Sequence, residues 1–453
     1  MATSKACTCP RSRGAGGLGG VMASVRQLVA GRQLLAPARL GAGWSQLFGR
    51  SVLLVGSTGL ARILGFGFTI VAARALGPAG FGLVTFTLTL ANMASVALFN
   101  SPAGLAPALV RASGSERRLV LSSYLTVIGV LLLASLVAAI PLGLITGLRG
   151  AVLAGLLANL IGITALTVYR EVLRGVDRYG AVAAYNVACN LVQLVAVAGL
   201  WFFGFTEPVL YITAFGLSSL AAIAVVAPWA HVSLRPSLRD VNRERVSAAA
   251  RFVAPMLLQT VFFMLWLNAD VIVLKALAGL APVGEYGVAK SLANAALLIP
   301  SAIATALLPQ AARIGNKDAR GYFVSLLVPV CAASLLPLAG LGVLGPWVLS
   351  HVFGPAFAAA SGALVVLALG MTLYGVAITL DASWTAMSRP SLVMLGTAAS
   401  AFVTLVLVVP LVLAFGMIGA AEAVAAGAAI KLAILVVVSL RGRPAGHPQK
   451  ELA

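Results

Sequence analysis

The sequence predicts an all-α integral membrane protein with about 12 transmembrane helices, arranged as two pseudo-symmetric six-helix bundles around a central cleft. Three observations lead to this prediction. Of the 453 residues, 60% are hydrophobic and only 9% are charged; apolar runs of membrane-spanning length recur along the chain; and its two halves share a sequence pattern. An ordinary soluble domain has about a quarter of its residues charged. A soluble enzyme, a disordered chain and a disulfide-rich secreted module are therefore excluded.

The predicted spans follow from the thickness of the bilayer. A helix needs about 20 apolar residues to cross the hydrocarbon core, and the chain contains such runs at 51–74, 80–104, 119–143, 150–170, 179–203, 208–230, 252–275, 285–309, 321–345, 358–385, 391–415 and 417–440. The predicted organisation is a basic, disordered cytoplasmic arm (1–46), an N-terminal bundle (47–230), a cytoplasmic linker (231–251), a C-terminal bundle (252–440) and a cytoplasmic tail (441–453).

The basic residues give the predicted orientation. The chain has 31 Lys and Arg against 12 Asp and Glu, a net charge of +19, and most of the basic residues fall on strictly alternate connections between spans. The other connections carry only Arg74, Arg149 and Lys275. The positive-inside rule then places both termini in the cytoplasm, and the charge requires no nucleic acid partner. Residues 1–46 lack the apolar core of a signal peptide; a mitochondrial transit peptide and a true start at Met22 are alternatives.

A repeat relates the two halves. Aligned without gaps, residues 89–111 correspond to residues 291–313, and the matches that carry most weight are Asn92/Asn294, Pro107/Pro309 and Arg111/Arg313. Upstream, residues 75–83 correspond to 276–288 if a three-residue insertion is allowed. Both matched spans run in the same direction, so the repeat is parallel, about an axis along the membrane normal. Two such bundles around a cleft are typical of an alternating-access transporter.

The runs RILGFGFTIVAARALGPAGFGLVTF (62–86) and NADVIVLKALAGLAPVGEYGVAKSL (268–292) carry a resemblance to a known family. They resemble the polysaccharide-precursor flippases of the multidrug/oligosaccharidyl-lipid/polysaccharide exporter (MOP) superfamily, and the similarity extends over about residues 50–440. The resemblance implies twelve or more helices in two bundles. It also implies outward movement of a lipid-linked glycan, whose head group passes through a polar cavity.

Charged side chains inside the spans are the first candidates for the cavity, since each costs roughly 2.5–3.5 kcal/mol at a helix centre. Arg62 lies halfway along the first span among several glycines, where we expect it to meet an anionic group such as a lipid diphosphate. Alternatively, it pairs structurally with backbone carbonyls. Lys431, near the middle of the last span, is a second cavity candidate. Asp381 is expected to be solvated at a helix end.

Further candidates come from the second half and from the repeat. Asp270 and Lys290 lie one short loop apart in the outer part of the membrane, where an ion pair would serve either as a gate or for structural closure. The equivalent Asn92 and Asn294 suit sugar hydroxyls or interhelical hydrogen bonds equally well. Pro102, Pro107, Pro300 and Pro309 interrupt the second span of each half, which indicates a hinge or a binding site.

The sequence therefore predicts a bacterial inner-membrane flippase that moves a polyprenyl-diphosphate-linked oligosaccharide to the outer leaflet for cell-surface polysaccharide biosynthesis. Its partners would be the lipid-linked glycan, membrane lipids and polysaccharide-assembly enzymes. No catalytic residue, metal site, P-loop or cofactor is predicted. The closest alternative is a proton- or sodium-coupled multidrug or organic-cation antiporter of the same superfamily, which would require acidic cavity residues. A lipid II-type flippase, a non-transporting scaffold for glycan assembly and a membrane glycosyltransferase are further alternatives.

Overall fold

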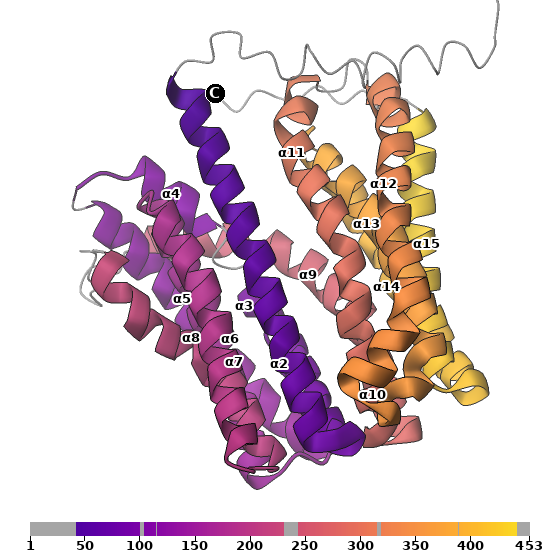
Figure 1. The fold of residues 1–453 in the computed structure, drawn as a ribbon. Coiled ribbons are helices and arrows are strands. Elements are labelled where there is room, and N and C mark those ends of the chain that lie inside the picture. Colours follow the sequence, from indigo (N-terminus) through magenta and orange to yellow (C-terminus); the bar gives the residue numbers. More distant parts are fainter. Residues whose placement is uncertain are drawn as a thin grey trace, which may run out of the picture. The chain divides into compact units, whose positions relative to one another are not determined.

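A computed structural model describes residues 42–99, 104–114, 116–230, 243–314, 319–387 and 389–441. Two compact units are distinguished, Met1–Val52 and Leu53–Ala453, and all packing described below lies within the second. No strand occurs in the described part of the chain. Its helices (Figure 1) are α2 (Ala42–Ala94), α3 (Val96–Phe99), α4 (Leu105–Arg111), α5 (Glu116–Ile145), α6 (Gly150–Gly175), α7 (Tyr179–Phe202), α8 (Pro208–Ala230), α9 (Arg243–Ala278), α10 (Leu280–Ala293), η3 (Asn294–Leu297), α11 (Leu298–Ile314), α12 (Ala319–Val348), η4 (Leu349–Phe353), η5 (Pro355–Ala360), α13 (Ser361–Ala386), α14 (Pro390–Phe415) and α15 (Met417–Arg441).

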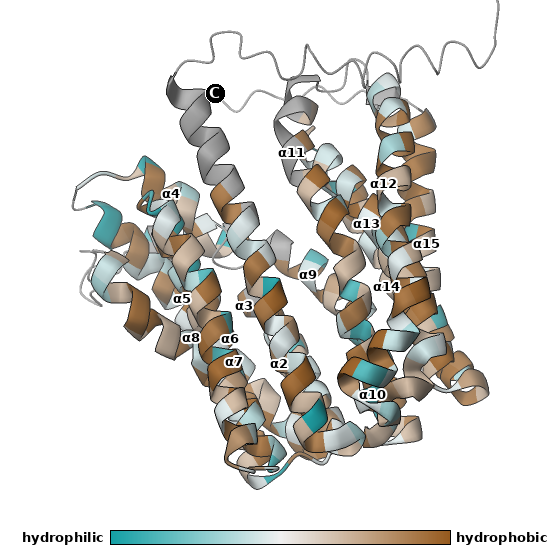
Figure 2. Ribbon diagram, viewed as in Figure 1, coloured by the Kyte–Doolittle hydropathy of each residue, from teal (hydrophilic) through white to brown (hydrophobic). Residues whose placement is uncertain are grey.

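Within the described residues, 11 helices are long and apolar enough to cross a membrane. Together they cover all the predicted spans, because the first two predicted spans lie in one helical stretch, Gly56–Ala94. This stretch is kinked at Gly77, whose φ of 64° and ψ of −179° are not helical and are favourable only for glycine. Hydrophobic residues dominate most of these helices (Figure 2). The chain is thus a multi-pass membrane protein.

Two helices begin earlier than the predicted domain boundaries. Helix α2 begins at Ala42, inside the predicted arm 1–46, and α9 begins at Arg243, inside the predicted linker 231–251. Neither stretch contains proline, and residues 243–251 are rich in Ala, Arg and Glu, which have good helix propensity, so the helices extend beyond their apolar parts. The predictions for residues 1–41, for the start of the linker and for the tail beyond Arg441 lie outside the described residues.

The second span is broken in both halves, at related positions. Helix α2 ends at Ala94, and α10 gives way to the 3₁₀ turn η3, which begins at Asn294. Of the four prolines, Pro107 and Pro300 each lie in the first turn of a new helix, α4 and α11, and Pro309 lies farther along α11. Pro102 lies outside the described residues. Proline is tolerated in a first turn but disrupts the turn before it, which accounts for the 3₁₀ turn η3 immediately before Pro300. Pro107 lies too far along the chain to cause the break after Ala94.

Each half is built from helices packed through small residues. In the first half α6 and α7 pack on α8, and in the second half α13 and α14 pack on α15 (Figure 1). A Cβ atom at Gly162 of α6 would lie 1.9 Å from the carbonyl oxygen of Gly216 on α8. Such close backbone approach is typical of membrane helices, where van der Waals packing replaces the hydrophobic effect.

The halves meet where α2 crosses α10. A Cβ atom at Gly82 would lie 1.9 Å from the carbonyl oxygen of Leu280, and a Cβ atom at Gly284 would lie 1.9 Å from that of Pro78. In the ungapped register of the repeat, Gly82 corresponds to Gly284 and Pro78 to Leu280, so the contact is reciprocal. We call this crossing the closed end.

The same register continues through the kink. Gly279 has a φ of 89° and a ψ of −170°, close to the angles of its counterpart Gly77. The three-residue insertion inferred upstream of the repeat is therefore wrong, since the ungapped alignment already pairs the two kinks. Gly and Ala occur at many neighbouring positions, so residue identities alone do not determine how the two repeats align here.

Basic residues at the closed end link the halves reciprocally. Arg74 of the first half donates hydrogen bonds from Nε to the carbonyl of Val352 (2.6 Å) and from Nη2 to that of His351 (2.7 Å). Lys275 of the second half donates from Nζ to the carbonyl of Thr146 (2.8 Å). The acceptors lie just beyond α5 and at the end of η4, where unsatisfied carbonyls attract cations. Arg74 and Lys275 are called the clasp below.

Candidate functional site

A cavity of about 860 Å³ lies between the two halves. Its first wall is formed by α2, α7 and α8, and its second wall by α9, α10, η3 and α11. Phe68 and Phe81 line it near the closed end, and Gly59, Asn92 and Leu298 line it farther along the same helices. A chamber bounded by both bundles suits a ligand that leaves on one side or the other as the bundles move.

Arg62 carries the free charge of this cavity. It is an exposed residue of α2 that lines the first wall, and no carboxylate among the described residues forms an ion pair with it. The neighbouring Gly59 has no atom within 4 Å of where its Cβ would lie, so the surroundings are open. A guanidinium held in this way has its planar donors available for an anion.

The two asparagines of the repeat face the same cavity from opposite walls. Asn92 lies on α2, shortly before that helix ends, and Asn294 is an exposed residue at the start of η3. Each therefore lies at the break in its half, where the backbone leaves the α-helix. The structure brings together three of the residues predicted from the sequence: Arg62, Asn92 and Asn294.

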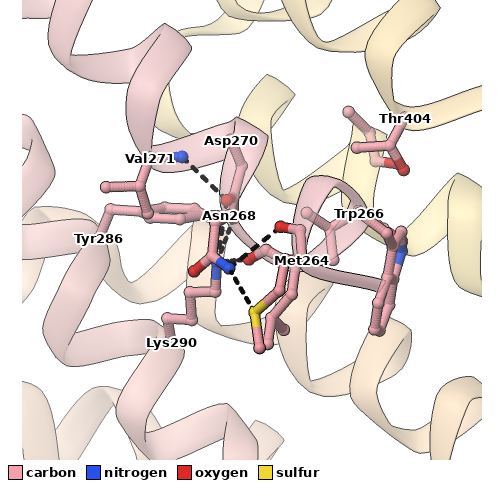
Figure 3. Close-up of polar contacts among 11 residues, drawn as sticks. Met264, Trp266, Asn268, Asp270, Val271, Tyr286, Lys290 and Thr404 are labelled. Carbon is pink, nitrogen blue, oxygen red and sulfur yellow. Dashed lines mark hydrogen bonds and ion pairs between the residues drawn. The ribbon is translucent and has the colours of Figure 1, made fainter. Parts of the chain in front are cut away.

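Lys290 also lines the cavity, and it is engaged within its own half (Figure 3). Its Nζ lies 2.9 and 2.7 Å from the two carboxylate oxygens of Asp270 and also donates to the carbonyl of Leu267. Asp270 is fully buried and accepts further hydrogen bonds from the Tyr286 hydroxyl (2.6 Å) and the Val271 amide (2.8 Å). These contacts occupy the three donors of an ammonium group, so Lys290 adds little free charge to the cavity.

The expectation that Lys431 lines the cavity is corrected by its position. Lys431 is 2% exposed, and its Nζ lies 2.6 Å from the Asp381 carboxylate, 3.1 Å from the Thr397 hydroxyl and 5.0 Å from the centre of the Tyr374 ring. Asp381, expected to be solvated, is largely buried in the same ion pair. This pairing could not be predicted from the sequence, because the two residues lie on different helices, α13 and α15.

Sequence reasoning missed several polar residues that line the cavity. Thr89 on α2, Asn190 and Gln193 on α7, and Asn268 on α9 all face it. Each is an uncharged polar residue inside an apolar run, a pattern that interhelical hydrogen bonds in membranes also produce. Nothing in the sequence separates the two cases, since only the packing shows which face of each helix borders the cavity.

Known proteins resemble this chain in both sequence and fold. The chain matches the sequence profile of the family described as "Polysaccharide biosynthesis protein" over residues 49–314. It is 25% identical over 271 residues to a Haloferax volcanii protein described as a probable low-salt glycan biosynthesis flippase, Agl15, and the match covers 57% of this chain and 55% of that protein. The chain thus spans about half the length of the relative that it matches.

Two solved structures show the same fold at low sequence identity. One is the lipid II flippase MurJ in an inward closed conformation, with a TM-score of 0.69, 16% identity, and coverage of 85% of this chain and 87% of that one. Another is an inward-facing multidrug resistance MATE family transporter of the MOP superfamily, with a TM-score of 0.63, 15% identity, and coverage of 87% and 94%. The family profile covers more than half of the sequence, and we conclude that this chain belongs to the polysaccharide biosynthesis protein family and has the fold of MOP-superfamily transporters.

Proposed function

We propose that the chain is an alternating-access flippase that moves a polyprenyl-diphosphate-linked oligosaccharide from the cytoplasmic to the outer leaflet of a bacterial inner membrane, for cell-surface polysaccharide biosynthesis. The observation that carries the proposal is the chemistry of the cavity. Of the described residues that line it, the charged ones are Arg62 and Lys290, and Lys290 is neutralised by Asp270. The free charge facing the substrate is then a single guanidinium.

A guanidinium suits a phosphate group, to which it donates two parallel hydrogen bonds. In this proposal Arg62 holds the phosphate next to the sugar, and the glycan occupies the remaining cavity. The name of the Haloferax volcanii relative supports a glycan-carrying substrate. Basic residues concentrated at alternate connections support cytoplasmic termini, so the part of the cavity near Gly59 and Asn92 would face the cytoplasm.

A multidrug or organic-cation antiporter has the same fold and is the alternative that the test must exclude. Such a protein needs a carboxylate facing its cationic substrate. In the described second half Asp270 is fully buried and Asp381 is largely buried, and both are paired with lysines. The residues that line the cavity include no acidic one among those described. An anionic substrate therefore fits this cavity better.

The proposal is tested by reconstituting the full chain into liposomes that contain a fluorescent polyprenyl-diphosphate oligosaccharide. Substituting Arg62→Ala should slow its appearance in the opposite leaflet by roughly 10- to 100-fold, which corresponds to the loss of hydrogen bonds to a charged group. Arg62→Lys should retain part of the activity because it keeps the charge but loses the planar donors.

Arg149→Ala is the matched control, because Arg149 is an exposed arginine at the start of α6 that does not line the cavity. It should transport like the wild type. Wild-type protein that leaves this lipid in place, and instead moves an organic cation against a proton or sodium gradient, would show that the chain is an antiporter.

A further inference from the structure

The first wall of the cavity contains buried polar groups that have no partner. Thr89 is 6% exposed and Gln193 is 4% exposed, and both line the cavity. Neither forms a hydrogen bond with another described residue. Their polar atoms are accessible from the cavity, so a ligand that fills the cavity can form hydrogen bonds with them.

The second wall is different. Asn268 is also buried there and lines the cavity, but its Nδ2 already donates to the Met264 carbonyl (3.0 Å) and contacts the Met264 sulfur (3.5 Å). Lys290 is engaged with Asp270, as Figure 3 shows. The buried polar groups of this wall are therefore used within their own half. Among the described residues that line the cavity, the buried polar side chains without a hydrogen-bond partner are Thr89 and Gln193 of the first wall. Asn190 of that wall is only partly buried, and its Nδ2 donates to the Asn186 carbonyl (2.9 Å).

Helical spacing gathers the polar groups of the first wall. Thr89 and Asn92 are three residues apart on α2, and Asn190 and Gln193 are three apart on α7, so each pair shares one helix face. A Cβ atom at Gly65 would lie 2.9 Å from the Asn190 Oδ1; the absence of a side chain there lets α7 approach α2. Arg62 is three residues before Gly65, so the guanidinium lies on the face of this first segment of α2 that α7 approaches.

We infer that Thr89, Asn92, Asn190 and Gln193 form a sugar-binding subsite on the first wall, beside the phosphate position at Arg62. The inference rests on the proposed function and specifies its substrate: the sugar next to the phosphate is uncharged and carries hydroxyl or acetamido groups. Amide side chains both donate and accept hydrogen bonds, which matches such groups. An acidic sugar would need a second free cation, and the described lining residues offer only Arg62.

The experiment compares the binding of short-chain fluorescent prenyl diphosphates to the detergent-solubilised full chain by anisotropy. The probes carry no sugar, one glucose or one N-acetylglucosamine. Wild-type protein should bind at least one sugar-bearing probe about tenfold more tightly than the sugar-free probe, as expected for one or two added hydrogen bonds. The double variant Thr89→Val, Gln193→Leu should bind the three probes equally, and its affinity for the sugar-free probe should stay unchanged.

Ser291→Ala is the matched control, because Ser291 corresponds to Thr89 in the repeat and lines the opposite wall; it should keep the preference for sugar. The thermal midpoint of the double variant should stay close to that of the wild type, since neither side chain forms a hydrogen bond with another described residue. A purely structural role would instead lower it.

The outcomes separate this inference from the proposed function. Equal binding of all probes by the wild type, or a sugar preference retained in the double variant, would overturn the subsite. A uniform loss of affinity for all probes in the double variant would overturn it as well. Unchanged affinities in Arg62→Ala, with the sugar preference intact, would overturn the phosphate position at Arg62 while the subsite stands. Binding of no probe by the wild type would contradict both.

Discussion

The two halves of the repeat share a backbone plan but use their side chains differently. Both have a glycine kink after their first span and a glycine at the crossing of α2 and α10. Around these fixed points the equivalent side chains differ in kind: Arg62 corresponds to Met264, Phe68 to Asp270, Val84 to Tyr286 and Leu88 to Lys290. Glycine is retained where the backbone requires it, whereas polar chemistry is free to diverge.

The difference assigns distinct tasks to the two halves. The second half uses its buried charges internally, in the pairs Asp270–Lys290 and Asp381–Lys431. The first half leaves Arg62 and several uncharged polar groups without partners at the cavity. A buried ion pair stabilises its own half, whereas polar groups without a partner are available to bind a ligand. The comparison therefore separates a wall that binds from a wall that supports.

The largest expected effect comes from breaking the internal network of the second half. Asp270→Ala leaves the Lys290 ammonium and the Tyr286 hydroxyl without their shared acceptor, and should cost about 3–5 kcal/mol of stability. Thermal unfolding of the protein in detergent measures this. The triple variant Asp270→Leu, Tyr286→Phe, Lys290→Leu makes the site as apolar as its first-half counterpart and should lose less stability than Asp270→Ala alone.

If the triple variant is less stable than Asp270→Ala, the network of Asp270, Tyr286 and Lys290 stabilises the second half by more than neutralising its own charges. The two halves would then differ in architecture as well as in chemistry.

A smaller effect is expected where the halves are alike. Gly284→Val places side-chain atoms against the Pro78 carbonyl, which lies 1.9 Å from the position of a Cβ atom, and such overpacking costs about 1–3 kcal/mol. We expect the closed end to open. Thr85 of α2 lines the cavity next to the crossing. The measurement is labelling of Thr85→Cys by an impermeant maleimide from the side of Gly77, in a chain whose four native cysteines are replaced by serine.

Gly56→Val is the matched control, because a Cβ atom at Gly56 would have nothing within 4 Å. Gly82→Val should behave like Gly284→Val, since the contact is reciprocal. Faster labelling in only one of the two would contradict the symmetry of the crossing.

The smallest expected effect concerns the clasp. Lys275→Ala removes one hydrogen bond to the Thr146 carbonyl, and Arg74→Ala removes two from the other half. Each should shift the balance between closed and open by no more than about tenfold, seen as modestly faster labelling of Thr85→Cys. Unchanged labelling in the double variant would show that the glycine crossing alone keeps this end shut.

Membrane insertion, the approximate spans and the existence of a repeat were determined by the sequence itself. These properties depend on composition and local periodicity: an apolar run of about 20 residues satisfies its own backbone hydrogen bonds as a helix in lipid, whatever surrounds it. Arg62 was identifiable because a lone mid-span charge is costly unless it faces a cavity or a partner.

Only the tertiary structure decided which polar residues face which neighbours. It paired Lys431 with Asp381 across α13 and α15, joined Lys290 to Asp270 and Tyr286 so that Lys290 is not free, and placed Thr89 and Gln193 on the cavity wall. It also fixed the register of the repeat through the angles of Gly77 and Gly279. A sequence specifies how polar a helix is. Whether a polar group is paired or vacant depends on helix rotation and on the helices packed beside it, which are properties of the assembled bundle.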